Sequence, residues 1–453
     1  MTTAALAGSE RRHEAVLLAW ALVVVLFAYT LLGLSQSPVI PAGTWIYGGS
    51  LAALALIAHV AIRRIAPYAD PLLLPVVFLL NGLGLVFVRR IDFATGDDLA
   101  VLQTRWTVVG VGMFVATLLL LSQGRRLTRF YYTFGLVTIG LLALPLLPVV
   151  GKEVNGARLW VELGSLSFQP GEFAKLTLVL FLAGYLDQKR ALLSVATERV
   201  GPFLLPPFRH LAPVLAGAGA ALVILVGQRD LGSSLLLLGV FIVLLYVATG
   251  RIAYPVIGGL TFALGGYLAY WAFAHVRSRF DIWLDPWSQV NEAGYQIAQA
   301  QFALGTGGLT GTGLGLGLPT EIPYAATDAI FAVIGEELGL LGATAVLLLF
   351  VLLVVRGFKI ALTASNEVDT LVAAGLTTII ALQVFIIVGG ITRLVPLTGI
   401  TLPFVSYGGS SLLGNHVLLA FLVWISHQAR KDAAPARIPA PARIPAPTNE
   451  AAE

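Results

Sequence analysis

Acidic residues beside basic or polar ones are the side chains of this sequence best suited to chemistry. Asp328 follows Thr327 at the start of a long apolar segment, after a glycine-rich stretch and with arginines nearby. Either residue can cap the N-terminus of the helix expected there. A carboxylate partly removed from water is also suited to act as a general base, because desolvation raises its pKa toward working pH. The sequence leaves both roles of Asp328 open.

Other charged residues lie within or beside apolar segments, where a charge costs about 2.5 kcal/mol or more. Glu172 and Lys175 are three residues apart, so they share one helix face and can neutralise each other. We interpret them either as an ion pair that holds helices together or as the polar floor of a substrate cavity. Asp230 is placed to cap a helix N-terminus, and Arg229 beside it can serve a ligand.

The stretch 394–415 combines helix-breaking and small residues where two helices would be expected to join. Pro396 and Pro403 interrupt helix, and four small residues follow at 408–411. Irregular backbone at membrane depth is tolerated where it is buried in protein or lines a wet cavity. Packing alone can explain the composition, but we favour a cavity wall.

The glycine run Gly305–Gly317 resembles a nucleotide-binding loop only superficially. It lacks the P-loop lysine and a preceding strand, so we interpret it as flexible backbone near a large ligand. The residues before it predict a short amphipathic helix with Gln296 and Gln299 on one side. The tryptophan-rich turn at Trp283–Trp287 is typical of a segment along the membrane interface.

Composition identifies the class of protein in which these residues must be positioned. Of 453 residues, 57% are hydrophobic and 11% are charged, against about 25% charged in a soluble domain. There is no cysteine, which excludes disulfides and thiolate chemistry. Apolar runs of membrane-spanning length predict an all-α polytopic membrane protein with about twelve transmembrane helices. These are expected at 15–34, 45–63, 71–89, 106–123, 130–150, 169–187, 211–227, 231–249, 252–275, 328–355, 367–391 and 403–427.

The distribution of basic residues predicts the orientation. Of the 28 Lys and Arg residues, 18 lie on the side that holds both termini and nine on the other side. The positive-inside rule therefore favours cytoplasmic termini and places the largest loop, 276–327, outside the cell. We expect three regions: 1–69 with two helices, a core at 70–427, and a disordered Pro/Ala-rich cytoplasmic tail at 428–453.

Five ordered motifs give the sequence a specific resemblance. They are "NGARLWVELGSLSFQPGEFAK", "QRDLGSSL", "WLDPW" with "GYQIAQAQFALGTGGLTGTGLG", "TDAIFAVIGEELGLLG" and "PLTGITLPFVSYGGSSLL". The chain resembles the SEDS family of cell-wall polymerases, which includes RodA and FtsW, and is most similar to the actinobacterial RodA type. The family's ten-helix core would then be preceded by two additional helices. Departures include Gly171, Arg229, Tyr324 and Ala329, whereas Asp328 is kept.

The resemblance implies a peptidoglycan glycosyltransferase that polymerises lipid II at the outer membrane face, for cell elongation and shape. It implies Asp328 as the general base on the acceptor 4-hydroxyl, and arginines that stabilise the lipid diphosphate leaving group. A divalent cation, Mg²⁺ or Mn²⁺, can assist, although no ligand cluster marks a metal site. The candidate substrate contacts are Arg158, Glu172, Lys175, Asp230, Arg277, Arg279, Gln296, Thr327, Arg393, Ser406 and Ser410.

Three alternatives remain at this stage. A lipid II flippase would use intramembrane charges and broken helices equally well, but it needs access to both faces. A scaffold that only recruits a transpeptidase would leave the charged residues without a chemical role. An FtsW-type division enzyme would use the same chemistry. The family acts with a class B penicillin-binding protein, a transpeptidase, so we expect such a partner.

Overall fold

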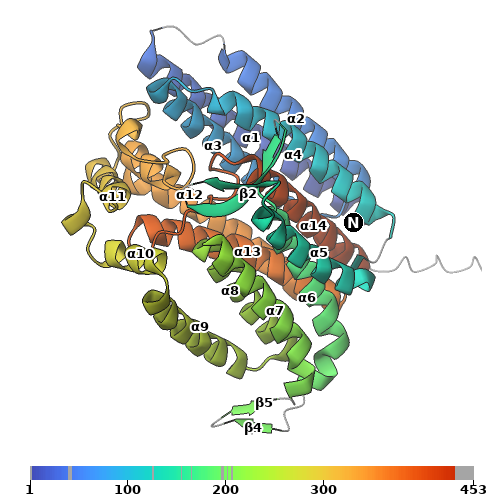
Figure 1. Ribbon diagram of the computed structural model, residues 1–453. Helices are drawn as coiled ribbons and strands as arrows, with labels where there is room; N and C mark the ends of the chain where they lie inside the picture. The colour runs from blue at the N-terminus through green and yellow to red at the C-terminus, as the bar shows by residue number, and fades with distance from the viewer. Residues whose placement is uncertain are drawn as a thin grey trace, which may run out of the picture.

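A computed structural model gives the arrangement of these elements (Figure 1). It describes residues 3–433 apart from 39–42, 125–126, 155, 165, 195–197, 201–202 and 206–207. The predicted all-α polytopic architecture is confirmed. The α-helices are α1 (Thr3–Gln36), α2 (Gly43–Ile65), α3 (Leu73–Thr95), α4 (Leu99–Ser122), α5 (Tyr131–Ala143), α6 (Gly171–Ser194), α7 (Phe208–Gln228), α8 (Leu231–Thr249), α9 (Ala253–Ala272), α10 (Ala274–Leu284), α11 (Tyr295–Gly307), α12 (Ile330–Thr363), α13 (Glu367–Ile391) and α14 (Gly409–Ala433).

The number of membrane spans agrees with the sequence only approximately. Each of the twelve expected segments overlaps one of the helices α1–α9 or α12–α14. Among the described residues, eight helices are long and apolar enough to cross a membrane, or nine if the bent pair α9–α10 is one span. The last expected segment starts too early, because residues 403–408 belong to the irregular stretch and α14 begins at Gly409. At its other end α14 runs to Ala433, so the expected tail 428–453 starts with helix, and 434–453 lie outside the described residues.

The centre of the bundle consists of α3, α13 and α14, whose residues are mostly buried. Lipid tails are as apolar as leucine, so membrane helices associate by close packing, often at small residues. Gly357 of α12 lies against Thr377 of α13 so closely that an added Cβ would be 2.3 Å from its hydroxyl oxygen. Gly82 of α3 likewise accommodates Val25 of α1. Glycines at these two contacts therefore allow the paired helices to pack closely.

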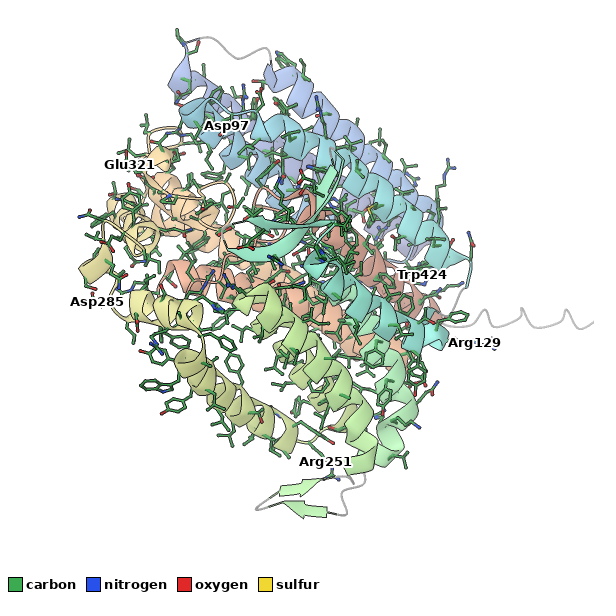
Figure 2. All side chains as sticks on the ribbon, in the orientation of Figure 1. Asp97, Arg129, Arg251, Asp285, Glu321 and Trp424 are labelled. Carbon is green, nitrogen blue, oxygen red and sulfur yellow. The ribbon has the colours of Figure 1, made fainter. Side chains whose placement is uncertain are left out.

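Both ends of the described chain lie at the same end of the bundle. Arg430 near the end of α14 contacts Glu10 of α1 at 2.8 Å and Asp70 at 3.3 Å. Figure 2 shows Arg129, Arg251 and Trp424 toward this end, whereas Asp97, Asp285 and Glu321 lie toward the other. The helices α10 and α11 and the loops before α12 belong to the latter end, which we call the loop end (Figure 1).

Two small sheets were not predicted from the sequence. Strands β1 (Gly151–Val154), β2 (Ala157–Leu163) and β3 (Leu166–Phe168) form an antiparallel meander between α5 and α6. Strands β4 (Glu198–Val200) and β5 (Phe203–Leu205) pair between α6 and α7. Short 3₁₀ turns complete the chain: η1 (Leu127–Phe130), η2 (Leu144–Leu146), η3 (Trp287–Gln289) and η4 (Pro319–Glu321). Both sheets lie between membrane segments and do not alter the helical bundle.

Candidate active site

Asp328 lies just before α12 but does not cap it. The helix begins at Ile330, its N-cap position is Ala329, and no side chain caps it. The expectation that Thr327 or Asp328 caps this helix is therefore wrong. The reason is a tight turn at Tyr324, which has a φ of 56° and whose carbonyl accepts the N–H groups of Thr327 and Ala329. The turn directs the Asp328 carboxylate toward another segment of the chain.

That segment is a short strip, residues 397–401, within the irregular stretch before α14. A Cβ added to Gly399 would be 3.4 Å from Oδ2 of Asp328. Withdrawal from water raises the pKa of Asp328 above its ordinary value, against the opposing effects of a hydrogen bond from Thr327 and the charge of Arg279. Asp328 is thus a carboxylate beside this strip whose raised pKa suits proton transfer.

Arg279, a neighbouring cation, also contacts the 397–401 strip. Nη1 of Arg279 in α10 donates to the carbonyl oxygen of Leu397 at 2.6 Å. The positive charge of Arg279 acts on both Asp328 and Asp230. Since a guanidinium has five N–H donors, this bond leaves others for an anionic ligand. Arg279 is therefore the cation that the structure places beside both acids.

Asp230 caps α8, as the sequence predicted. Its Oδ1 accepts the N–H of Ser233 at 2.9 Å. Burial nevertheless raises its pKa, and the negative charge of Glu172 contributes in the same direction. The start of α8 packs on the strip, because a Cβ at Gly232 would meet Ile400 at 2.7 Å and Thr398 at 3.1 Å. The start of α8, which Asp230 caps, and Asp328 therefore both lie against the 397–401 strip.

Glu172 and Lys175 form the predicted ion pair. Their Oε2 and Nζ atoms are 2.6 Å apart, and both side chains are buried. Lys175 also donates to Oε1 of Gln383 in α13 at 3.0 Å, and Nε2 of Gln383 donates to the Thr401 carbonyl at 3.3 Å. Gln383 was not among the site residues predicted from the sequence. A polar side chain inside the apolar segment 367–391 was the available signal.

The two candidate serines support backbone in the structure. The Ser406 hydroxyl donates to the Thr327 carbonyl at 2.5 Å and accepts the N–H of Leu402 at 2.9 Å. The Ser410 hydroxyl accepts the N–H of Gln169 at 2.9 Å. Ser406 therefore connects the stretch before α14 directly to the loop that carries Asp328.

Four candidate contacts lie apart from this group of residues. Arg158 pairs with Glu153 at 3.1 Å on the exposed β1–β2 hairpin. Arg277 is exposed and donates to the carbonyls of Tyr270 and Trp271, where α9 and α10 meet. The remaining two bond to backbone at other places: Arg393 to Trp283 and Leu284, and Gln296 to Pro323. None of the four has a described contact with Asp328.

The glycine-rich loop is packed against α12. At Gly339 the helix is broken, with a φ of 67°, and N–H groups of Leu340 and Leu341 bond to carbonyls of Gly308 and Leu309. Glu337 accepts the N–H of Gly315 at 2.8 Å and pairs with Arg90 of α3 at 2.6 Å. The roles of Arg90 and Glu337 were not predicted from the sequence. These contacts hold the loop on the bundle and do not support its interpretation as free backbone around a ligand.

The described residues contain no group of three His, Asp or Glu side chains that could hold a metal ion. The fold and site together define a multi-pass membrane protein in which buried and half-buried acidic and basic side chains surround one strip of backbone at the loop end.

Comparisons with known proteins identify the family. The family described as "Cell cycle protein", of FtsW, RodA and SpoVE, matches residues 70–431. The peptidoglycan glycosyltransferase RodA of Mycobacterium tuberculosis is 45% identical over 430 residues, which cover 93% of this chain and 92% of the relative. Stage V sporulation protein E of Bacillus subtilis is 35% identical over 369 residues, 80% of this chain and 98% of the relative.

A solved structure agrees with this result. It is titled "Structural coordination of polymerization and crosslinking by a peptidoglycan synthase complex", with a TM-score of 0.55, 29% identity, and coverage of 84% of this chain and 97% of that chain. The chain therefore belongs to the FtsW/RodA/SpoVE family. The resemblance stated from the five sequence motifs, including similarity to actinobacterial RodA, is confirmed.

Proposed function

We propose that this chain is a peptidoglycan glycosyltransferase that polymerises lipid II at the outer face of the cytoplasmic membrane. Its relatives named peptidoglycan glycosyltransferase support the reaction class. The observation that carries the proposal is the position of Asp328, a carboxylate withdrawn from water and under the influence of the Arg279 charge. A role in elongation, as opposed to division, follows from the similarity to RodA proteins.

The reaction joins a sugar hydroxyl to the anomeric carbon of the donor through an oxocarbenium-like transition state. Asp328 accepts the proton of the acceptor 4-hydroxyl while the oxygen of that hydroxyl bonds to the anomeric carbon of the donor. The bond from that carbon to the diphosphate oxygen breaks, and the lipid diphosphate leaves as an anion. No acid is needed to protonate such a leaving group. A guanidinium can bind it in a bidentate manner, and Arg279 is the cation placed to do so.

The other candidate contacts keep different proposed roles. Glu172, Lys175 and Asp230 form the polar floor beneath the strip, and Thr327 hydrogen-bonds the base. Arg158, Arg277, Arg393 and Gln296 would contact substrate only at parts distant from the reacting carbon. A divalent cation remains a proposal. Since the acids here do not gather as a ligand set among the described residues, we derive no step through a metal.

We further propose a class B penicillin-binding protein as partner and cytoplasmic termini. The related structure titled as a peptidoglycan synthase complex supports the partner, because its title joins polymerisation to crosslinking. The excess of basic residues on the side of the termini supports the orientation.

The test is polymerisation of fluorescent lipid II by purified protein, with and without the partner transpeptidase. Asp328→Asn should lower the rate about 100-fold or more, the usual scale for loss of a general base, with thermal unfolding unchanged. Asp97→Asn makes the same chemical change at an exposed carboxylate at the same end and should retain the wild-type rate. A wild-type rate for Asp328→Asn would show that Asp328 is not the base.

A further inference from the structure

The ion pair Glu172–Lys175 and the base Asp328 have no described contact with each other. What connects them is the 397–401 strip. Gly399 of the strip lies against Asp328, and Thr401 accepts a hydrogen bond from Gln383. A short chain of contacts therefore runs from Lys175 through Gln383 to Thr401, and from there along the backbone to Gly399 beside Asp328.

Gln383 is well placed to fix this strip. It lies in α13, which Figure 1 shows at the centre of the bundle and which contacts α6, α8 and α12. Its side chain is 1% exposed, so both of its hydrogen bonds are sheltered from water. One bond accepts from the Lys175 ammonium and the other donates to the Thr401 carbonyl. Such bonds are expensive to remove, because the Thr401 carbonyl would lose its bond to Gln383 and the Lys175 ammonium would keep only one described contact, that with Glu172.

The strip needs such an anchor because its own backbone is irregular. Gly399 has a φ of 75°, a conformation that glycine adopts readily, and residues 392–408 contain neither helix nor strand. Arg279 fixes the first residue of the strip through the Leu397 carbonyl, but it is itself a proposed ligand of the substrate. At the other end of the strip the Thr401 carbonyl accepts from Gln383, and the Thr401 hydroxyl donates to Ser411 of α14 at 2.9 Å.

We propose that Gln383 is a positioning residue for glycosyl transfer, which links the Glu172–Lys175 pair to the 397–401 strip and so holds Gly399 against Asp328. This inference rests on the proposed role of Asp328 as the base. In this proposal the Glu172–Lys175 pair orients Gln383, and Gln383 orients the 397–401 strip beside the base.

The experiment compares full-length variants in the lipid II assay with the partner present. Gln383→Met keeps the size of the side chain and removes both hydrogen bonds. We expect kcat to fall about tenfold or more while KM stays within about twofold, since the strip shifts but the substrate cations remain. The acid limb of the pH–rate profile should move to lower pH, because a displaced Gly399 lets water reach Asp328. Arg279 and Thr327 still face the carboxylate in this variant.

A second variant protects the test against misfolding. Gln383→Glu keeps an oxygen acceptor for Lys175 and loses the amide donor to Thr401, so it should show the same loss of kcat. The matched control is Thr378→Val in the same helix, whose buried hydroxyl bonds, among the described residues, only to the Ala374 carbonyl of its own helix. That control should keep the wild-type kcat and pH profile.

The outcomes separate the two proposals. If Gln383→Met or Gln383→Glu folds and retains wild-type kcat, or if the acid limb does not move, Gln383 has no positioning role. If Thr378→Val loses as much activity as Gln383→Met, the effect is general disturbance of α13 and the inference is overturned. Asp328→Asn in the same assay tests the base itself. An inactive Asp328→Asn beside an unaffected Gln383→Met would reject only the inference about Gln383.

Discussion

At the scale of single residues, the surroundings of Asp328 decide between a structural and a chemical role. A capping aspartate would bond to N–H groups of the first helical turn. Here the Tyr324 carbonyl accepts the N–H groups of Thr327 and Ala329, no side chain caps α12, and the Asp328 carboxylate lies against Gly399. This half-buried carboxylate does not stabilise its helix, and proton transfer is the role that we propose for it.

The raised pKa of Asp328 makes the acid limb of activity testable. The base works only when deprotonated, so the rate should fall as pH drops through its pKa, above the ordinary value of about 4. The Thr327 hydroxyl, which also donates to the Tyr324 carbonyl at 3.3 Å, lowers this pKa, and Thr327→Val removes that effect. The midpoint of the acid limb should therefore move upward by about half a pH unit to one unit. The measurement is kcat/KM for lipid II between pH 4.5 and 8, and a midpoint that stays or moves downward would contradict the assignment.

At the scale of secondary-structure elements, the break in α12 is the place where the glycine-rich loop packs on the bundle. Gly339 allows the helix to open, and the loop inserts backbone bonds at the opening. Glu337 and Arg90 then join the loop to α3 through a buried ion pair. The loop end is therefore built from α3, α12 and the loop together.

Gly339→Ala should disturb this arrangement. An added Cβ would be 2.2 Å from the backbone nitrogen of Gly311, and the positive φ is unfavourable for alanine by about 1–2 kcal/mol. We expect destabilisation of about 2 kcal/mol or more, seen as earlier thermal unfolding in detergent. The control is Gly112→Ala in α4, where a Cβ would meet nothing within 4 Å. Equal unfolding temperatures for Gly339→Ala and wild type would show that the break tolerates a side chain.

At the scale of the whole molecule, the bundle has two chemically different ends. Both described chain ends lie at one, together with Arg129 and Arg251, and the site with its loops lies toward the other (Figure 2). The first two helices precede the residues matched by the family, yet α1 packs along α3 and its Gln36 reaches the Gly315 carbonyl at 3.3 Å. The additional helices are thus in contact with the family core at both ends.

The absence of cysteine allows a direct test of orientation. Ser288→Cys lies exposed on the loop between α10 and α11, and Ser365→Cys lies exposed between α12 and α13. A maleimide that cannot cross membranes should label Ser288→Cys in intact cells and Ser365→Cys only after permeabilisation. The reverse pattern would mean that the site faces the cytoplasm, which is incompatible with polymerisation at the outer face.

The sequence determined the features that depend on neighbouring residues. Hydropathy located the helices, because each apolar run must satisfy its own backbone hydrogen bonds in lipid. Spacing paired Glu172 with Lys175 and made Asp230 a cap, since residues three apart meet within one helical turn. The motifs also identified the family from the sequence alone. Each of these results depends on contacts within a few residues.

Only the tertiary structure decided which distant residues meet. Gly399 lies against Asp328, and Gln383 bonds to Lys175 across a separation of 208 residues. Sequence spacing did not distinguish Arg279, which faces the acids, from Arg393, which bonds to the end of α10. These contacts arise from the packing of α6, α10 and α13 around one irregular strip. No local periodicity encodes that packing, so the composition of the site had to come from the folded bundle.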